Sequence, residues 1–312
     1  MTAIVAGQRS AVHHRTLGIA RMRLPQGVGA TSLMTAYARA QESRRADAIF
    51  LDRWAEACVD AATGHRSGPL PPLGFARDEG ASTLWREFGS YLALRTVFYD
   101  EHLLKASRDG LRQVVLLAAG MDARAYRLVM HPGSTVFELD HDDVFAFKEE
   151  VFAAVGEAPT CPRRLVVADL LADWPAALLA AGFDPGESTV WLAEGLLMYL
   201  SPEDADQLMA TLTGLSAPGS RIISEYPDHR PSTEFFTSRC TDDADRRMAA
   251  GMSGLLQAGP SEEPSVWLRR HGWIPEVTEI AAFIASLGRP VPPICSTAPD
   301  ACSVWLFAGQ LT

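Results

Sequence analysis

Residues 113–128, QVVLLAAGMDARAYRL, decide the fold class of this chain. The unbroken apolar run over 114–119 has the length of one strand. Its lack of alternation predicts a strand covered on both faces, as in a parallel sheet. Gly120 can adopt backbone angles closed to other residues, and Asp122 is placed to cap a helix over 123–130. The stretch therefore predicts a strand, a tight glycine turn and a helix.

A second strand follows at a distance typical of nucleotide-binding folds. Residues 135–140, TVFELD, end in acidic side chains about 20 positions after the turn. A carboxylate at this spacing, here Asp140, can hold the two ribose hydroxyls of a nucleoside. A βαβ unit with a purely structural turn and a solvated acid is the alternative interpretation, and the spacing alone leaves it open.

The composition excludes several classes of protein. The net charge is −10 over 312 residues, which argues against a nucleic-acid partner because such binding depends on basic surface. Five widely spaced cysteines without a C-x-x-C pair indicate reduced, mostly buried thiols, with neither a disulfide framework nor a metal site. No signal peptide and no apolar run of membrane-spanning length are present, so we expect a cytoplasmic protein without a membrane partner.

Alternation of strands and helices continues to the end of the chain. Seven apolar segments that resemble strands, separated by helical patterns, predict an α/β fold with a parallel, doubly wound sheet. We expect a flexible tail or lid over 1–30, a helical cap over 31–110 and the sheet domain over 111–312. Residues 231–260 are polar and contain methionine, which indicates a helical insertion.

The predicted helix over 82–105 carries an arginine on its apolar face. Arg95 is in phase with apolar residues spaced by three and four positions. A guanidinium turned towards a core must meet an anion, since an unpaired buried charge is costly. That anion is either a protein carboxylate, which periodicity alone favours, or a ligand carboxylate held by two hydrogen bonds.

Three predicted strands end in an acid. These are Asp140, then Asp169 in VVADL, then Glu194 in VWLAEG. The carboxyl ends of parallel strands form the ligand edge of an open α/β sheet. Three acids there predict a cleft for hydroxyls, amines and cations, which fits a cationic nucleoside better than a triphosphate. No G-x-x-x-x-G-K-[ST] motif is present, which weakens an ATPase or kinase interpretation.

These segments together resemble a known family. The matching motifs are LLAAGMDARAYRL (116–128), VFELDHDDVFAFK (136–148), VVADL (166–170), WLAEGLLMYL (191–200) and WLRRHGW (267–273). The set resembles the leucine carboxyl methyltransferase family of S-adenosyl-L-methionine-dependent O-methyltransferases, and more closely its bacterial branch linked to small-molecule substrates. The resemblance implies a Rossmann-like, seven-stranded methyltransferase sheet with an N-terminal helical cap.

The resemblance also implies roles for individual residues. Arg95, in a motif similar to the family's R-T-x-F-x-D, would hold the methionyl carboxylate of S-adenosyl-L-methionine. Asp140 would hold the ribose, with Glu138 as a weaker second candidate. Glu194 would lie near the methionyl amine and the reacting methyl group, with Tyr199 close to the substrate. The backbone beside the cofactor would be Ala118, Ala119 and Gly120, and the adenine would be bordered by Asp169 and Leu170.

The sequence departs from the family at one position of the glycine turn. The family usually has glycine where this chain has Ala118, so we expect the backbone there to keep a negative φ. Asp122 fits the motif and is interpreted as a helix cap rather than a ligand.

The acceptor is expected to be a small molecule, most often a carboxylate, as in secondary metabolism. A carboxylate is already ionised at neutral pH and needs no base, whereas a phenol needs one. The histidines that could serve by region are His102, His141, His229 and His271. Arg39 and Arg44 could steer an anionic acceptor, or could form a solvated helix face.

Two other function classes stay open. An NAD-dependent oxidoreductase also uses a glycine turn and a ribose-binding acid, although a full G-x-G-x-x-G is absent. A protein that binds S-adenosyl-L-methionine without transferring its methyl group is the second. The sequence does not decide the oligomeric state.

Overall fold

The computed structural model describes residues 23–64, 82–296 and 301–312. Its strands form one seven-stranded sheet in the order β3-β2-β1-β4-β5-β7-β6. The strands are β1 (Gln113–Leu117), β2 (Thr135–Asp140), β3 (Arg163–Val167), β4 (Thr189–Ala193), β5 (Arg221–Pro227), β6 (Trp273–Glu279) and β7 (Val304–Leu311). The seven strands predicted from the sequence are confirmed.

The direction of the last strand corrects the prediction of a parallel sheet. Strands β1 to β5 pair in parallel, but β7 lies between β5 and β6 and runs antiparallel to both. Helix α11 (Ile280–Ser286) precedes β7 and packs against α3 (Thr83–Arg108), β6 and β7. Alternation in a sequence gives the order of elements, but it does not give the strand pair between which the last strand inserts.

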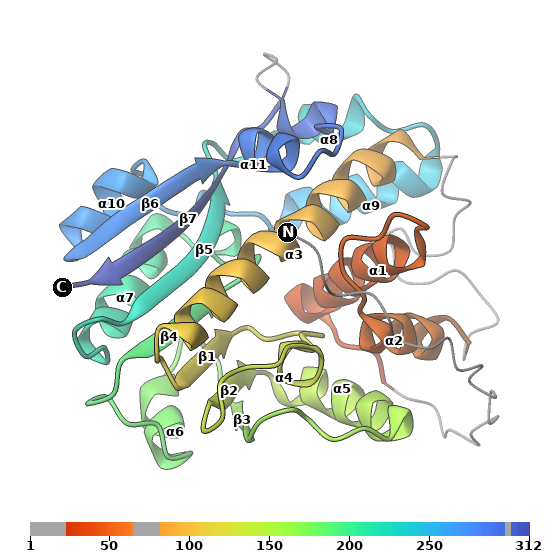
Figure 1. The fold of residues 1–312 in the computed structure, drawn as a ribbon. Helices are drawn as coiled ribbons and strands as arrows, with labels where there is room; N and C mark the ends of the chain where they lie inside the picture. The colour runs from red at the N-terminus through yellow and green to blue at the C-terminus, as the bar shows by residue number, and fades with distance from the viewer. Residues whose placement is uncertain (1–22, 65–81, 297–300) are drawn as a thin grey trace.

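The helices cover both faces of the sheet (Figure 1). Besides α3 and α11, they are α1 (Thr31–Arg44), α2 (Arg53–Gly64), α4 (Arg124–Arg127), α5 (Asp142–Val155), α6 (Trp174–Ala180), α7 (Pro202–Gly214), α8 (Thr233–Thr237), α9 (Asp243–Leu255) and α10 (Pro264–Arg270). Short 3-10 turns are η1 (Gly27–Ala30), η2 (Leu197–Tyr199) and η3 (Pro293–Cys295).

Strand β1 shows how the sheet divides the core. Successive side chains of a strand point to opposite faces. Val114 and Leu116 belong to a cluster with α1, α2, α3, α5 and α11, whereas Val115 and Leu117 belong to a cluster with α6, α7 and α10. All five residues of the strand are buried, as the absence of alternation in the sequence predicted.

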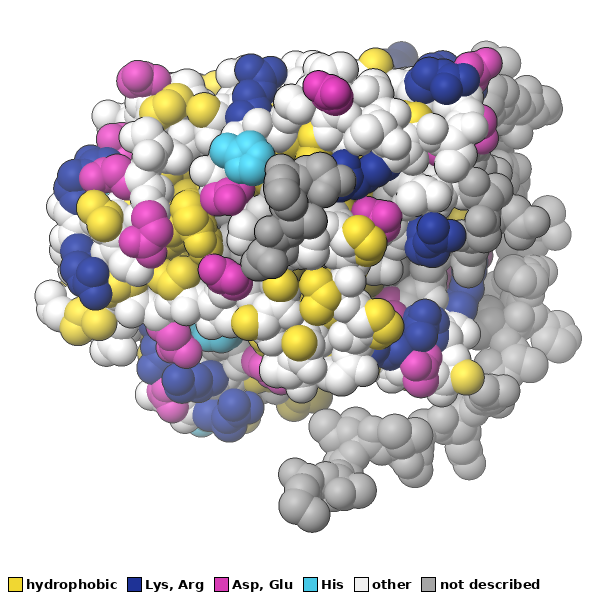
Figure 2. All heavy atoms as spheres, turned by 90° about the horizontal axis from the view of Figure 1, so that it is seen from above, with side chains coloured by type: hydrophobic (Ala, Val, Ile, Leu, Met, Phe, Trp, Pro, Cys, Tyr) yellow, Lys and Arg dark blue, Asp and Glu magenta, His cyan; other side chains and the backbone are white. Residues whose placement is uncertain are grey.

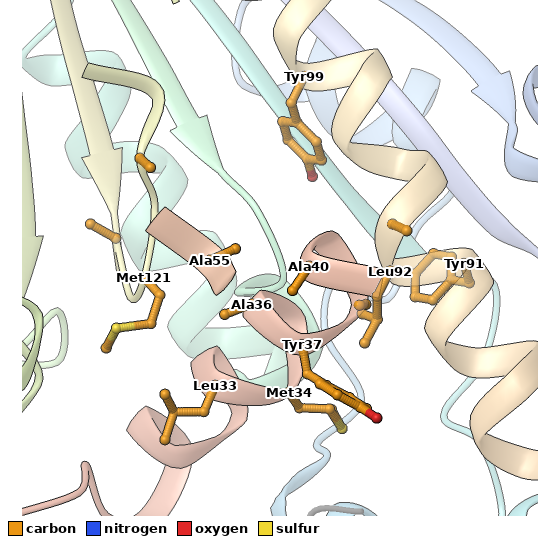
Figure 3. Close-up of a cluster of buried hydrophobic side chains, with 14 of the residues drawn as sticks. Leu33, Met34, Ala36, Tyr37, Ala40, Ala55, Tyr91, Leu92, Tyr99 and Met121 are labelled. Carbon is orange, nitrogen blue, oxygen red and sulfur yellow. The ribbon is translucent and has the colours of Figure 1, made fainter. Parts of the chain in front are cut away.

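The N-terminal helices pack against the ligand edge of the sheet. In Figure 3, the side chains of α1 lie between Met121, in the loop after β1, and Tyr91 and Leu92 of α3. Helix α3 is 26 residues long and also packs on β4, β5 and β7. The described part of 31–110 contains α1, α2 and α3. Residues 1–22 of the predicted tail lie outside the described residues.

The predicted insertion is helical as well. Helices α8 and α9 lie within 231–260 and pack against each other. The face drawn in Figure 2 carries acidic and basic side chains interspersed with apolar ones. Within the described parts of the chain, no helix combines the length and apolar character needed to cross a membrane.

Candidate active site

A cavity of about 280 Å³ opens where the carboxyl ends of β1 to β4 meet the N-terminal helices. Ten of the twelve residues that the sequence assigned to the site line it, and Glu138 and Arg44 do not. The ten are Arg39, Arg95, Ala118, Ala119, Gly120, Asp140, Asp169, Leu170, Glu194 and Tyr199. The topology therefore gathers residues more than 150 positions apart at one edge of the sheet.

The glycine turn is closed from above by α1. Gly120 has φ +48°, a conformation that favours glycine. A Cβ placed there would lie 2.6 Å from the Cβ of Ser32, so a side chain has no room. The Gly120 N–H donates to Asp140 Oδ2 at 2.6 Å. The turn and the acid of the next strand are thus bonded directly to each other.

Ala118 corrects one expectation. Its φ is +48°, in the left-handed region, whereas the sequence predicted a negative value. The N–H of the next residue, Ala119, donates to the carbonyl of Leu139 at 2.9 Å, which fixes the turn to β2. A non-glycine residue in this region carries a steric cost of about 1–2 kcal/mol. Glycine adopts this conformation without that cost, which agrees with the glycine that the resemblance implies at this position.

Two backbone N–H groups hold the carboxylate of Asp140 in place. Besides the Gly120 N–H, its carboxylate accepts the N–H of His141 at 2.8 Å. Burial raises the pKa of Asp140, and both hydrogen bonds act in the opposite direction. Two oxygens offer about four acceptor positions, so the group can accept further hydrogen bonds from a ligand in the cavity.

Arg95 enters the cavity from α3 and meets protein carboxylates. Its Nη1 lies 2.7 Å from Glu225 Oε1, and its Nε lies 3.4 Å from Glu194 Oε1. The Tyr91 hydroxyl accepts a hydrogen bond from Nη1 at 3.1 Å. Burial acts to lower the pKa of Arg95, but Glu225, Tyr91 and Glu194 together outweigh this and raise it. The protein carboxylate that periodicity favoured is therefore present, and the guanidinium also lines the cavity.

Gly195 allows this approach of Arg95. It has φ +66°, and a Cβ there would lie 2.9 Å from Arg95 Nη2. Its N–H donates to Glu225 Oε1 at 2.9 Å. The turn after β4 therefore binds the same carboxylate oxygen that holds the arginine.

Glu194 is shared between two arginines. Its Oε2 lies 2.7 Å from Arg124 Nη2, and its other oxygen faces Arg95. Burial acts to raise the pKa of Glu194, but the charges of Arg124 and Arg95 lower it overall. Glu194 is consequently an anion at neutral pH.

Arg124 organises the acids behind the cavity. Its Nε donates to Asp100 Oδ1 at 2.7 Å, and its Nη1 pairs with Asp122. Asp122 also accepts the Arg124 N–H at 2.6 Å. The predicted helix is a single turn, α4, and the residue at its N-cap position is Ala123. The helix thus begins one residue later than predicted, and Asp122 lies one position before its N-cap residue. Asp122 also lines the cavity.

The sequence analysis did not identify Glu225 or Arg124 as site residues, although the sequence contains a signal for Glu225. Glu225 ends the apolar part of β5 as Asp140 ends β2, so the rule that selected the other acids applied to it as well. Arg124 follows Asp122 by two positions in a loop, where no periodicity marks its direction.

Glu138 and Arg44 lie elsewhere. Glu138 is fully buried and pairs with Lys148 and Arg163, each at 2.6 Å, so it is an internal ion-pair partner and not a wall of the cavity. Arg44 is half exposed, 3.7 Å from Glu56, which corresponds to the solvated-face interpretation. Arg39 does line the cavity; its Nε donates to Asp52 at 2.9 Å and its Nη2 to the Met121 carbonyl at 2.6 Å.

The four candidate histidines are dispersed. His141 is exposed at the rim of the cavity beside Asp140. His102 and His271 lie near Glu276 and Asp206, and His229 pairs with Asp228 at 2.6 Å. Of the four, only His141 is among the described residues that line the cavity.

The comparison with known proteins decides the family. The sequence profile described as leucine carboxyl methyltransferase matches residues 32–213. The chain belongs to the leucine carboxyl methyltransferase family. The match spans α1, the glycine turn and the strand ends that carry Asp140, Asp169 and Glu194, so it contains most of the site.

Relatives of high similarity carry a common name. A "Putative S-adenosyl-L-methionine-dependent methyltransferase" of Parafrankia sp. (strain EAN1pec) is 42% identical over 267 residues, 85% of this chain and 83% of the relative. One of the same name from Mycolicibacterium paratuberculosis is 42% identical over 265 residues, 80% of this chain and 84% of the relative. A crystal structure titled as a putative methyltransferase from Thermobifida fusca has a TM-score of 0.47 at 17% identity, covering 89% of this chain and 94% of that one.

Proposed function

We propose that this family member is an S-adenosyl-L-methionine-dependent O-methyltransferase that converts a carboxylate of a small molecule into its methyl ester. The cofactor supplies a methyl group on a positively charged sulfur. Transfer to oxygen is an in-line displacement that neutralises charge. The protein therefore contributes mainly by positioning both reactants and excluding water.

The residues present fit this cofactor. Arg95 Nε and Glu194 Oε1 are buried in the cavity wall and face each other at 3.4 Å as an ion pair, and neither forms a hydrogen bond with any described residue. These two atoms offer a donor for a carboxylate and an acceptor for an ammonium group, the two ends of an amino acid. In this proposal Arg95 binds the methionyl carboxylate and Glu194 its amine. Asp140 binds the ribose hydroxyls, and Asp169 and Leu170 border the adenine.

The proposal of a carboxylate acceptor rests on the protonation states of four side chains that line the cavity. Burial raises the pKa of the Tyr91 and Tyr199 hydroxyls and raises the pKa of the Cys295 and Cys302 thiols to about 12. These four groups stay protonated at neutral pH, and the one histidine among the described lining residues, His141, is exposed at the rim beside Asp140 and is not buried in the wall. A phenol acceptor needs a base poised near the working pH, whereas a carboxylate is ionised without one.

Tyr199 supports the same choice in a second way. It lines the cavity next to the strand end that carries Glu194. A tyrosine that stays protonated is a hydrogen-bond donor. We assign it to orient the acceptor carboxylate, with Arg39 further along the wall as a source of positive potential.

A methyl-transfer assay with a binding control tests the proposal. S-adenosylhomocysteine is expected to raise the melting temperature, because a ligand that binds only the native state stabilises it. Asp140→Ala and Arg95→Ala are expected to abolish the rise, whereas Asp173→Ala, an exposed acid outside the cavity, keeps it. Tritiated methyl transfer to organic acids measures the reaction itself.

The outcomes separate the alternatives. Binding without transfer to any carboxylic or phenolic acceptor would favour a non-methylating protein. Competition of the bound ligand by NAD⁺ would favour an oxidoreductase. Failure of S-adenosylhomocysteine to bind at saturating concentration contradicts the proposal.

A further inference from the structure

We propose that the methyl acceptor is a monocarboxylic acid with an apolar body, and that a second charge on that body excludes a molecule from the site. The inference rests on the proposed function and adds the substrate class. It is drawn from the part of the cavity that lies beyond the residues assigned to the cofactor.

This part of the cavity, called here the acceptor compartment, is built from side chains of five segments. Its walls come from α1, α3, the η2 region, the α8–α9 insertion and the segment from η3 to β7. The insertion contributes Phe235, Phe236, Met252 and Leu256, and Ile294 faces the same space. Aromatic and aliphatic side chains that meet in one concave wall select an apolar ligand.

The distribution of charge in the wall is the second observation. Among the described residues that line the whole cavity, the acids are Asp122, Asp140, Asp169 and Glu194, all at or just after strand ends. The acceptor compartment adds to these the neutral polar groups of serine, threonine, tyrosine and cysteine side chains, and two cations, Arg39 of α1 and Arg95 of α3. Apart from these two arginines, its described walls offer no ionised group to a charged substituent.

The cations of the cavity wall are already occupied. Arg39 is bonded to Asp52 and to the Met121 carbonyl, and Arg95 is paired with Glu225. A second carboxylate on the acceptor would lose its hydration in the compartment without gaining a counter-ion there. Burial of an unpaired charge costs several kcal/mol, which is enough to exclude dicarboxylic acids.

Apolar surface on the acceptor is expected to raise the catalytic efficiency. Each buried methylene contributes about 0.8 kcal/mol, or about a fourfold change. The value of kcat/KM should rise by about fourfold per methylene from butanoate towards decanoate, until the compartment is filled. Decanedioate has the length of decanoate with a second carboxylate, so it is the matched probe for charge. We expect its kcat/KM to be at least about 100-fold lower.

A single substitution tests the charge argument. Thr35→Lys places a cation in the α1 wall at a side chain that is only partly buried, so the fold should tolerate it. The new lysine can form an ion pair with the second carboxylate of decanedioate, which decanoate lacks. The ratio of kcat/KM for decanedioate to that for decanoate is therefore expected to rise at least about tenfold. Leu179→Lys makes the same change at an exposed site on α6 outside the cavity and should leave the ratio unchanged.

The measurements distinguish this inference from the proposed function. Calorimetric binding of decanoate to the complex with S-adenosylhomocysteine requires no methyl transfer. If decanoate binds but is not methylated, the proposed function is overturned, whereas the assignment of an apolar acceptor compartment still holds. Methylation of decanedioate as fast as decanoate, or rates independent of chain length, would overturn the inference and keep the function. The chain-length series uses the unmodified chain, so it does not depend on whether the variant folds.

Discussion

Arg95 Nη1 lies 2.7 Å from Glu225 Oε1, and both side chains are buried between α3 and β5. The same glutamate oxygen accepts the Gly195 N–H. Burial raises the pKa of Glu225, although Arg95 acts in the opposite direction. The arginine assigned to the ligand is thus positioned by a carboxylate that competes with the ligand for its charge.

Glu225→Gln is therefore expected to have opposite effects on stability and on ligand binding. Removing one charge of a buried pair lowers the free energy of unfolding of the free protein, by about 3 kcal/mol. The rise in melting temperature caused by S-adenosylhomocysteine should become larger, because Arg95 then has one competitor fewer. Thermal unfolding with and without the ligand measures both effects, with exposed Glu276→Gln as the control. Loss of ligand binding in Glu225→Gln would instead give Glu225 a direct contact with the ligand.

Ala118→Gly should slightly stabilise the protein, by about 0.5 kcal/mol. Glycine removes the cost of a positive φ, about 1–2 kcal/mol, and returns about 0.4–1 kcal/mol through the greater freedom of the unfolded chain. Ala119→Gly is the matched control. Its φ is not positive, so it has only the unfavourable effect and should destabilise. Urea unfolding of both variants measures the difference; equal destabilisation would show that Ala118 carries no strain.

The stability of the protein in acid should depend on Asp122. Burial acts to raise its pKa, but the charges of Arg124, Lys148 and Arg127 and the hydrogen bond from the Arg124 backbone N–H together outweigh this and lower it to about 2 from an ordinary value of 3.8. A group with a lowered pKa stabilises the fold above its unfolded pKa and loses that effect as the pH falls through the folded value. Asp122→Asn should therefore cost about 2 kcal/mol at pH 7, and the cost should disappear between about pH 4 and pH 2.

Urea unfolding across that pH range tests this expectation. For the control Asp60→Asn, at an exposed position on α2, the free energy of unfolding should change with pH as it does in the unmodified protein. If the difference in free energy of unfolding between Asp122→Asn and the unmodified protein is constant from pH 7 to pH 2, the charge of the carboxylate does not stabilise the fold.

Tyr199→Phe should reduce kcat/KM for a carboxylic acceptor by about 10- to 100-fold, the effect of one hydrogen bond to a charged group. The rate should stay independent of pH between about pH 6 and 9 in both proteins, because the acceptor is ionised throughout. Tyr126→Phe, outside the cavity, is the control. A rate that rises with pH in the unmodified protein and not in Tyr199→Phe would assign Tyr199 the role of a base.

Local features of the fold could be predicted from the sequence. The strand predicted over 135–140 coincides with β2 (Thr135–Asp140), because its apolar run ends in acidic residues and is followed by a helical pattern. The acids Asp140, Asp169 and Glu194 were found by one rule, that parallel strands end at the ligand edge.

Relationships between distant segments could not be predicted in this way. Burial of Arg95 followed from periodicity, but its partner Glu225 is 130 positions away, and three other acids satisfied the strand-end rule. Glu138 alternates correctly with Asp140, yet Lys148 of α5 and Arg163 of β3 neutralise it inside the protein. The direction of β7 depends on the strand pair that receives it, which is a property of the assembled sheet.

The N-terminal helices are more than an outer layer of the sheet domain. Ser32 of α1 closes the glycine turn from above, and Arg95 of α3 reaches the strand end that carries Glu194. In the proposed function, residues 111–312 are therefore incomplete as a binding unit. Exchange of α1 and α3 between relatives is then expected to alter recognition of the cofactor together with the choice of acceptor, so that the two specificities do not recombine as independent modules.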